Sequence, residues 1–303
     1  MTMLRRAFHV VAQAFLALAL LSAPAFAEQP VVAQIKAHPA LWIVHGEKGT
    51  AYLFGSIHLL PPNIVWHTPQ IDAAIGKTDV FVFEAPTDDA AKASIQGFIQ
   101  KNGVLPADQS LPSLLNADMR ADYRAALDLT GVAPETLVNK RPWLAGLMLS
   151  VSSMKRENYS PDSGVDQRVV TIARANKKPL QYFETLEQQA EMMLPPDPQL
   201  ELEEFGLTLK DVLNAKENIG QLVDAWSRGD VAELYRLTHA DLVKSPGAEK
   251  VLFIDRNTKW VAQLQSMLRQ PKTYFVTVGA GHLAGPHSVP TMLRAKGYRV
   301  DGP

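Results

Sequence analysis

Strand-like hydrophobic runs gather near the two ends of the chain. The runs 41–44 and 50–54 flank a short turn containing glycine, which predicts an opening hairpin. "DVFVFEAP" at 79–86 is a near-continuous apolar run, typical of a strand buried on both faces of a parallel sheet. "KTYFVTVGAGH" at 272–282 and "YRVDG" at 298–302 predict two more strands. The pattern therefore predicts one sheet assembled from both ends of the chain.

Apolar positions three to four residues apart predict helices for most of the remaining chain. Besides helices at about 68–77 and 288–297, the expected helices cover 88–101, 112–129, 134–158, 162–176 and, with proline breaks, 186–268. The run "KPLQYFET" at 178–185 predicts a short strand among them. We expect an α/β fold: a single domain with a mixed sheet and a large central helical insertion at about 88–270.

The first 27 residues have a different pattern from the rest. Arg5 and Arg6 precede an apolar stretch, which ends on Ala25-Phe26-Ala27. This order is typical of a secretory signal peptide at 1–27, so the mature protein would be 28–303 and periplasmic or secreted. A membrane anchor is the alternative, but the apolar run is short for a bilayer span. The arginine pair leaves the export route, Sec or twin-arginine, open.

Composition narrows the functional classes. The 303 residues are 47% hydrophobic and 20% charged, with a formal net charge of −1, so there is no electrostatic reason to expect nucleic-acid binding. The chain has no cysteine, which excludes disulfides, thiolate catalysis and iron–sulfur clusters. An exported protein without cysteine suits a bacterial periplasm, and we expect no membrane association after signal cleavage.

Two distant segments share one motif and the same surroundings. Gly55-x-x-His58 and Gly279-x-x-His282 each follow a strand-like run and precede a proline-containing turn, a helix and another strand. Only glycine and histidine recur between the motifs, which argues against Ser56 as a nucleophile. Glu84 also follows a strand-like run, and ligands of open α/β sheets bind beyond the carboxyl ends of strands.

Two histidines and one carboxylate are the composition of a metal site. His58, His282 and Glu84 together suit Zn, Mn, Co or Fe, and such a site activates water or polarises a carbonyl group. Each residue also has a simpler interpretation. A buried histidine commonly satisfies a backbone group, and Glu84 has the alternatives of capping a helix or forming a salt bridge.

The other candidates have structural interpretations of similar weight. Glu184 is either a second carboxylate or, as we favour slightly, an acid at the N-terminus of the helix after it. Arg256 would hold a carboxylate or an oxyanion, or pair with Asp255 or Glu249. Asp166 is expected at a helix start. The remaining assignments are Arg141-Pro142-Trp143 as a helix start with a packed tryptophan, and His67, His239 and His287 as surface or capping residues.

The chain resembles the TraB/GumN family in the order and spacing of its motifs. From about Ala40 to Val300 these motifs are "LFGSIHLLPP", "TDVFVFEAP", "RPWLAG", "FETLEQQ", "DRNTKW" and "VGAGHLAGPHSVPTMLRAKGYRV". The resemblance implies an erythromycin esterase/ChaN-like fold and kinship with Tiki-type metal-dependent proteases and with proteins that shut down peptide pheromones. It implies metal or catalytic roles for His58, Glu84 and His282, and it matches Arg256 and Asn257 to the family's Arg-Asn motif. Unlike the Tiki proteins, the chain lacks cysteines and a membrane anchor.

These observations lead to three hypotheses. The first is a periplasmic metal-dependent hydrolase, with Mn, Co or Zn, that cleaves an amide or ester bond of a peptide-like or small-molecule substrate. The second is a protein that binds a peptide or haem without turnover, with histidine as an axial ligand. The third is a metal-free enzyme in which His58 is the general base and Glu84 orients it.

Overall fold

A six-stranded mixed sheet forms the centre of the protein. The computed structural model describes residues 33–303 except 196, 240–241 and 243–245. The strands are β2 (Leu41–His45), β3 (Thr50–Ser56), β5 (Val80–Phe83), β6 (Leu180–Tyr182), β7 (Thr273–Gly279) and β8 (Arg299–Asp301), in the order β6-β5-β7-β3-β2-β8. Strands β6, β5, β7 and β3 are mutually parallel, and β2 pairs antiparallel with β3 and β8. The predicted hairpin and the sheet from both chain ends are confirmed.

The pairing of β3 with β7 brings the two GxxH motifs together. These two strands come from opposite ends of the chain, and they run parallel with Gly55 opposite Val278 and Ser56 opposite Gly279. Because both strands end at the same edge of the sheet, the segments that follow them begin side by side. A Cβ at Gly55 would lie 3.1 Å from the Cα of Ala280, so this position requires glycine for close packing.

Helices cover both faces of the sheet. Helices α2 (Pro69–Gly76), α8 (Val165–Ala175) and α11 (Ala215–Ser227) pack on one face, while α14 (Asp255–Met267) and α15 (Val289–Ala295) pack on the other. Neighbouring strand residues alternate between the two cores: Phe54 and Phe275 belong to the first, and Leu53 and Val276 to the second. This burial on both faces explains the continuous apolar runs of β5 and β7.

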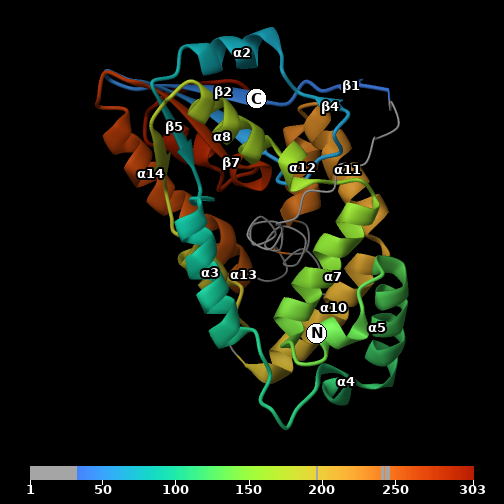
Figure 1. The fold of residues 1–303 in the computed structure, drawn as a ribbon. Helices are drawn as coiled ribbons and strands as arrows, with labels where there is room; N and C mark the ends of the chain where they lie inside the picture. Colours follow the sequence, from blue (N-terminus) through green and yellow to red (C-terminus); the bar gives the residue numbers. More distant parts are fainter. Residues whose placement is uncertain (1–32, 196, 240–241, 243–245) are drawn as a thin grey trace.

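A third core lies in a helical arm that extends away from α2 (Figure 1). The arm contains α5 (Ala117–Thr130), α7 (Pro142–Arg156) and α10 (Pro198–Leu213), packed around residues such as Tyr123, Leu149 and Leu209. Buried Glu201 of α10 accepts hydrogen bonds from Arg141 and from the backbone N–H of Trp143 at the start of α7. The helix start predicted at Arg141-Pro142-Trp143 is confirmed.

Several helix boundaries differ from the sequence pattern. The region 112–129 divides into α4 (Leu111–Leu114) and α5, and 134–158 divides into α6 (Pro134–Leu137) and α7 because Arg141 is extended before a proline. The remaining helices are α3 (Asp89–Asn102), η1 (Pro161–Ser163), α9 (Leu186–Met192), α12 (Val231–His239), α13 (Pro246–Glu249), the π-helix η2 (Lys250–Ile254) and η3 (Ala280–Leu283). Strand β6 and helices α8 and α14, all within 88–270, belong to the central sheet layers.

The sequence features assigned to export fall outside this description. The segment 1–27 lies wholly before the first described residue. Among residues 33–303 with the gaps given above, no helix has the length and apolar character needed to cross a membrane. Besides the main sheet, β1 (Ile35–Lys36) and β4 (Ile64–Val65) form a short parallel pair.

Candidate functional site

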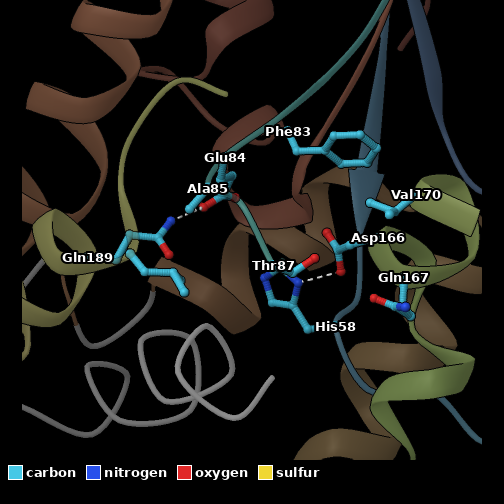
Figure 2. Close-up of a pocket in the computed structure, with 10 residues that line it drawn as sticks. His58, Phe83, Glu84, Ala85, Thr87, Asp166, Gln167, Val170 and Gln189 are labelled. Carbon is cyan, nitrogen blue, oxygen red and sulfur yellow. Dashed lines mark hydrogen bonds and ion pairs between the residues drawn. The ribbon is translucent and has the colours of Figure 1, made fainter. Parts of the chain in front are cut away.

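A histidine–aspartate pair links the end of β3 to the start of α8. His58 lies two residues beyond β3, and its Nδ1–H donates a hydrogen bond to Asp166 Oδ2 at 2.5 Å (Figure 2). The start of α8 packs directly on the His58 backbone: Val165 N–H donates to Ile57 O at 3.1 Å, and a Cβ at Gly164 would lie 2.0 Å from His58 O. Glycine at 164 therefore allows α8 to approach closely enough for Asp166 to reach the imidazole.

The pairing changes the protonation of both side chains. Burial alone would lower the pKa of His58, but the charge and hydrogen bond of Asp166 and the nearby charge of Glu84 outweigh it, so the pKa is raised above 6.5. Burial would raise the pKa of Asp166, but His58 and, to a smaller extent, the hydroxyl of Ser56 lower it below its usual value. The pair therefore favours imidazolium beside carboxylate.

Glu84 is held at the carboxyl end of β5 by three donors. Its Oε1 accepts from the backbone N–H of Gly279 at 2.6 Å, and its Oε2 accepts from Arg256 Nη2 at 2.7 Å and from Gln189 Nε2 at 3.1 Å. The side chain is 5% exposed. Burial raises the pKa of Glu84 in spite of the opposing charge of Arg256. The salt-bridge interpretation of Glu84 is confirmed.

Arg256 binds two carboxylates from neighbouring strand ends. Besides Glu84 at the end of β5, its guanidinium donates to Glu184, which follows β6, with Nη2 to Oε2 at 2.9 Å and Nε to Oε1 at 3.0 Å. Trp260, one helical turn further along α14, donates its indole N–H to Glu184 at 3.0 Å and lies under the guanidinium, 4.7 Å from its central carbon. Although burial opposes it, the two carboxylates raise the pKa of Arg256, which stays charged.

The structure corrects the sequence interpretation of Glu184 and decides between the two alternatives for Arg256. Glu184 is not the acid that serves the next helix, because Thr185 caps α9 and the Glu184 carboxylate binds α14 instead. For Arg256, the alternative of holding a carboxylate is the one observed, and Asp255 pairs with Lys250 instead. The role of Glu184 was not evident from the sequence because its partner Arg256 lies 72 positions away, and local sequence carries no signal for this contact.

His282 is neutral, and both of its ring nitrogens are hydrogen-bonded. Arg256 Nη1 donates to Nε2 at 3.0 Å, which requires the proton to be on Nδ1, and Nδ1–H donates to Asn257 Oδ1 at 2.6 Å. Burial, followed by the charge of Arg256, lowers the pKa of His282 well below 6.5. Asn257 in turn donates to the carbonyl of His287 at 2.8 Å, which fixes the amide orientation.

A small cavity of about 40 Å³ adjoins the histidine–aspartate pair. It is lined by His58, Phe83, Glu84, Ala85, Thr87, Asp166, Gln167, Val170, Leu186 and Gln189. This space admits a few water molecules, and a haem would require the surrounding helices to move apart. Of the five predicted site residues, His58 and Glu84 line the cavity. Arg256, Asn257 and His282 do not line it: Arg256 bonds to Glu84, His282 bonds to Arg256, and Asn257 bonds to His282.

The predicted metal ligands do not fit a metal centre in this arrangement. The charged guanidinium of Arg256 bonds to Glu84 Oε2 and to His282 Nε2, so it occupies the position that a cation shared by these two side chains would take. His58 uses Nδ1 for Asp166. Among the residues that the structure describes, no group of three or more His, Asp or Glu side chains is arranged to hold a metal ion. The metal centre stays a prediction from the sequence.

For two residues of this region the structure shows contacts that the sequence did not predict. Asp166 lies in the first turn of α8, as expected, but its carboxylate serves His58; the glycine two positions before it was the available signal. His239, expected as a surface or capping residue, is the last residue of α12 and is buried between the rings of Tyr235 and Phe253, and burial lowers its pKa to about 4. Phe253 also contacts the ring of His282, so His239 supports the packing behind the site.

The fold and site define a class: an α/β protein with a histidine–aspartate pair and a buried arginine–carboxylate network beyond the carboxyl ends of parallel strands. The chain belongs to the TraB/PrgY/gumN family, whose model matches residues 40–302. The resemblance seen in the sequence motifs is thereby confirmed.

Relatives in the family are similar over most of their length. The uncharacterized protein YbaP of Shigella flexneri is 24% identical over 264 residues, covering 84% of this chain and 92% of the relative. YbaP of Escherichia coli K12 is 24% identical over 251 residues, covering 80% and 87%. An uncharacterized protein of Treponema pallidum is 21% identical over 268 residues, covering 84% and 80%. No solved structure matches this chain.

Proposed function

We propose that this protein is a hydrolase that cleaves an ester or amide bond of a peptide-like substrate, with His58 as the general base. The observation that carries the proposal is the 2.5 Å hydrogen bond between His58 Nδ1 and Asp166 in the wall of a cavity. A histidine held in one tautomer by a carboxylate, beside space for water, is the arrangement that general-base catalysis requires. Because the N-terminus has the pattern of a signal peptide, we place this activity in the periplasm or outside the cell.

The expected reaction uses the second ring nitrogen of His58. Since Nδ1 is hydrogen-bonded to Asp166, proton transfer goes through Nε2, which takes a proton from a water molecule as that water attacks the carbonyl carbon. The imidazolium is stabilised by Asp166 and by the nearby charge of Glu84, the same groups that raise the pKa of His58. It then returns the proton to the leaving alcohol or amine as the carbon–oxygen or carbon–nitrogen bond breaks.

Arg256 and Glu84 have positioning roles in this mechanism. Arg256 does not line the cavity, and its hydrogen bond to Glu84 holds that carboxylate in the cavity wall. Glu84 differs from its expected role, since Asp166, and not Glu84, forms the hydrogen bond that orients His58. The geometry thus favours the metal-free hypothesis, with Asp166 in the orienting position.

The test is hydrolysis of a panel of p-nitrophenyl esters and peptide p-nitroanilides by the purified chain in EDTA. We expect His58→Gln and Asp166→Asn to lower kcat by about 10²–10⁴-fold, the usual contribution of a positioned base. His67→Gln is the matched control, because His67 Nδ1 pairs with Asp72 at 2.6 Å in the same way but on the surface. This control should keep wild-type activity.

The same panel distinguishes the other hypotheses. Hydrolysis that disappears in EDTA and returns with added Mn, Co or Zn would contradict the metal-free mechanism and restore the metal-dependent one. Equal activity of wild type and His58→Gln would remove His58 as the base. No hydrolysis of any substrate, together with a Soret band on haem titration, would favour a binding protein.

A further inference from the structure

A second, larger recess adjoins the cavity of the histidine–aspartate pair. It encloses about 220 Å³ and is lined by Thr87, Asp88, Asp89, Lys92, Pro161, Asp162, Gln167 and Arg174. We call it the charged groove. Thr87 and Gln167 line both spaces, so the charged groove and the small cavity share a wall. Figure 2 shows Thr87 beside His58, and Gln167 on the helix that carries Asp166.

Part of the charge in the groove is already engaged within the protein. Lys92 pairs with Asp89 along α3, with Nζ to Oδ1 at 3.5 Å. Asp88 caps the same helix by accepting from Ala91 N–H at 2.9 Å. These three charged side chains therefore help to form the start of α3, and the recognition of a ligand would depend mainly on the remaining two.

Arg174 and Asp162 are the remaining pair of opposite charges. Both side chains are exposed, and within the described part of the chain neither has an ion-pair partner within 4.0 Å. They line one groove, yet they do not pair with each other. A guanidinium and a carboxylate that line one recess without pairing with each other are complementary to a ligand that carries both charges.

We propose that the charged groove binds a small zwitterion, with its carboxylate on Arg174 and its ammonium group on Asp162. This deepens the proposed function and rests on it: a ligand bound there lies next to His58, so the preferred substrates would be short peptides with free ends. Guanidinium suits the carboxylate because its planar donors match the two oxygens. A volume of about 220 Å³ suits a ligand of one or two small residues.

The experiment measures binding without turnover, on the His58→Gln protein. Isothermal titration with alanyl-alanine, with its N-acetyl form and with its C-terminal amide gives three dissociation constants. We expect each blocked form to bind about three- to tenfold more weakly than the free dipeptide, as for partly exposed charge pairs. Free alanine is a fourth probe, and equally tight binding of it would show that a single amino acid, such as a product, supplies the zwitterion.

Two variants test which residue binds the carboxylate of the ligand and which binds its ammonium group. Arg174→Gln should abolish the difference between the free dipeptide and its amide, and Asp162→Asn should abolish the difference between the free and acetylated forms. Lys177→Gln, just beyond the end of α8 and outside the groove lining, should change neither. Absence of dipeptide binding, equal binding of all three forms, or a preference that survives both variants would overturn the proposal. Because no turnover is measured, these outcomes do not depend on whether His58 is a base.

Discussion

At the residue scale, the protein contains two histidine–aspartate pairs in different surroundings, one on the surface and one beside the cavity. His67 and Asp72 form a hydrogen bond of 2.6 Å, close to the 2.5 Å of His58 and Asp166, but both side chains are substantially exposed, at 38% and 55%. His58 and Asp166 are only 12% and 14% exposed, and Glu84 adds a second negative charge nearby. Water screens a surface pair far more than a buried one, and in the buried pair the pKa of His58 is raised and that of Asp166 is lowered.

The pKa of His58 predicts the pH dependence of activity. A general base must be neutral, so kcat/KM should rise with pH through a midpoint above 6.5, the ordinary histidine value. Asp166→Asn removes the main charge that raises this pKa and leaves burial, which lowers it. We therefore expect the midpoint of the acid limb to move to lower pH in Asp166→Asn while the plateau falls.

A pH–rate profile of wild type, Asp166→Asn and His67→Gln checks this. The profile of His67→Gln should overlay that of wild type.

The raised pKa of His58 also links the stability of the fold to pH. Protonated His58 contributes its full stabilisation below pH 6.5, and this contribution is lost as pH rises through the folded-state pKa. In the kinetic experiment, an acid limb of the pH–rate profile that does not move in Asp166→Asn would show that His58 is not the group that titrates.

At the element scale, the sequence predicts the strands well and their partners less well. The apolar runs of β3, β5 and β7 are continuous because helices cover both faces, and this made them recognisable. The start of α8 was also predicted at Asp166. Its contact with His58 was not, because it depends on a backbone approach between segments 108 positions apart.

Gly164 is the residue that makes this approach possible. Its backbone φ of −58° is open to any residue, so space, not conformation, requires glycine there. In Gly164→Ala, the new Cβ must move away from His58 O, which should displace the start of α8 and cost about 1–3 kcal/mol of unfolding free energy. We expect kcat to fall and the acid limb of the pH profile to shift downwards, as in Asp166→Asn.

Urea denaturation and the pH–rate profile together measure this effect. The control is Gly220→Ala in α11, where a Cβ would meet nothing within 4 Å. Alanine there should be neutral or slightly stabilising, because glycine is the poorer helix former. If Gly164→Ala keeps both wild-type stability and the wild-type pH midpoint, close packing of α8 does not position Asp166.

At the scale of the whole molecule, the side chain of Arg256 joins helix α14 to the edge of the sheet, where it binds Glu84 and Glu184. The sequence predicts the helix and the sheet but not this contact between them. Parallel pairing predicts that residues after β5, β6 and β7 share an edge, and Glu84, Glu184 and His282 do so. The sequence has no signal that α14 lies across this edge with its arginine among them. That arrangement depends on Trp260 and Leu264 packing under the opposite face of the sheet.

The role of Arg256 as a link between layers predicts a large effect on stability. Arg256→Gln would leave Glu84 and Glu184 buried without their cation, and breaking a buried pair in this way costs about 3–5 kcal/mol. The cost should shrink as pH falls, because burial raises the pKa of Glu84 and a protonated carboxyl no longer needs the guanidinium. Lys250→Gln, which breaks an exposed pair with Asp255 at the start of the same helix, should cost about 0–1 kcal/mol.

Urea unfolding of both variants at pH 5 and pH 8 measures the difference in the loss of unfolding free energy. Equal losses for the two variants, or a loss for Arg256→Gln that does not depend on pH, would mean that this network does not hold α14 against the sheet.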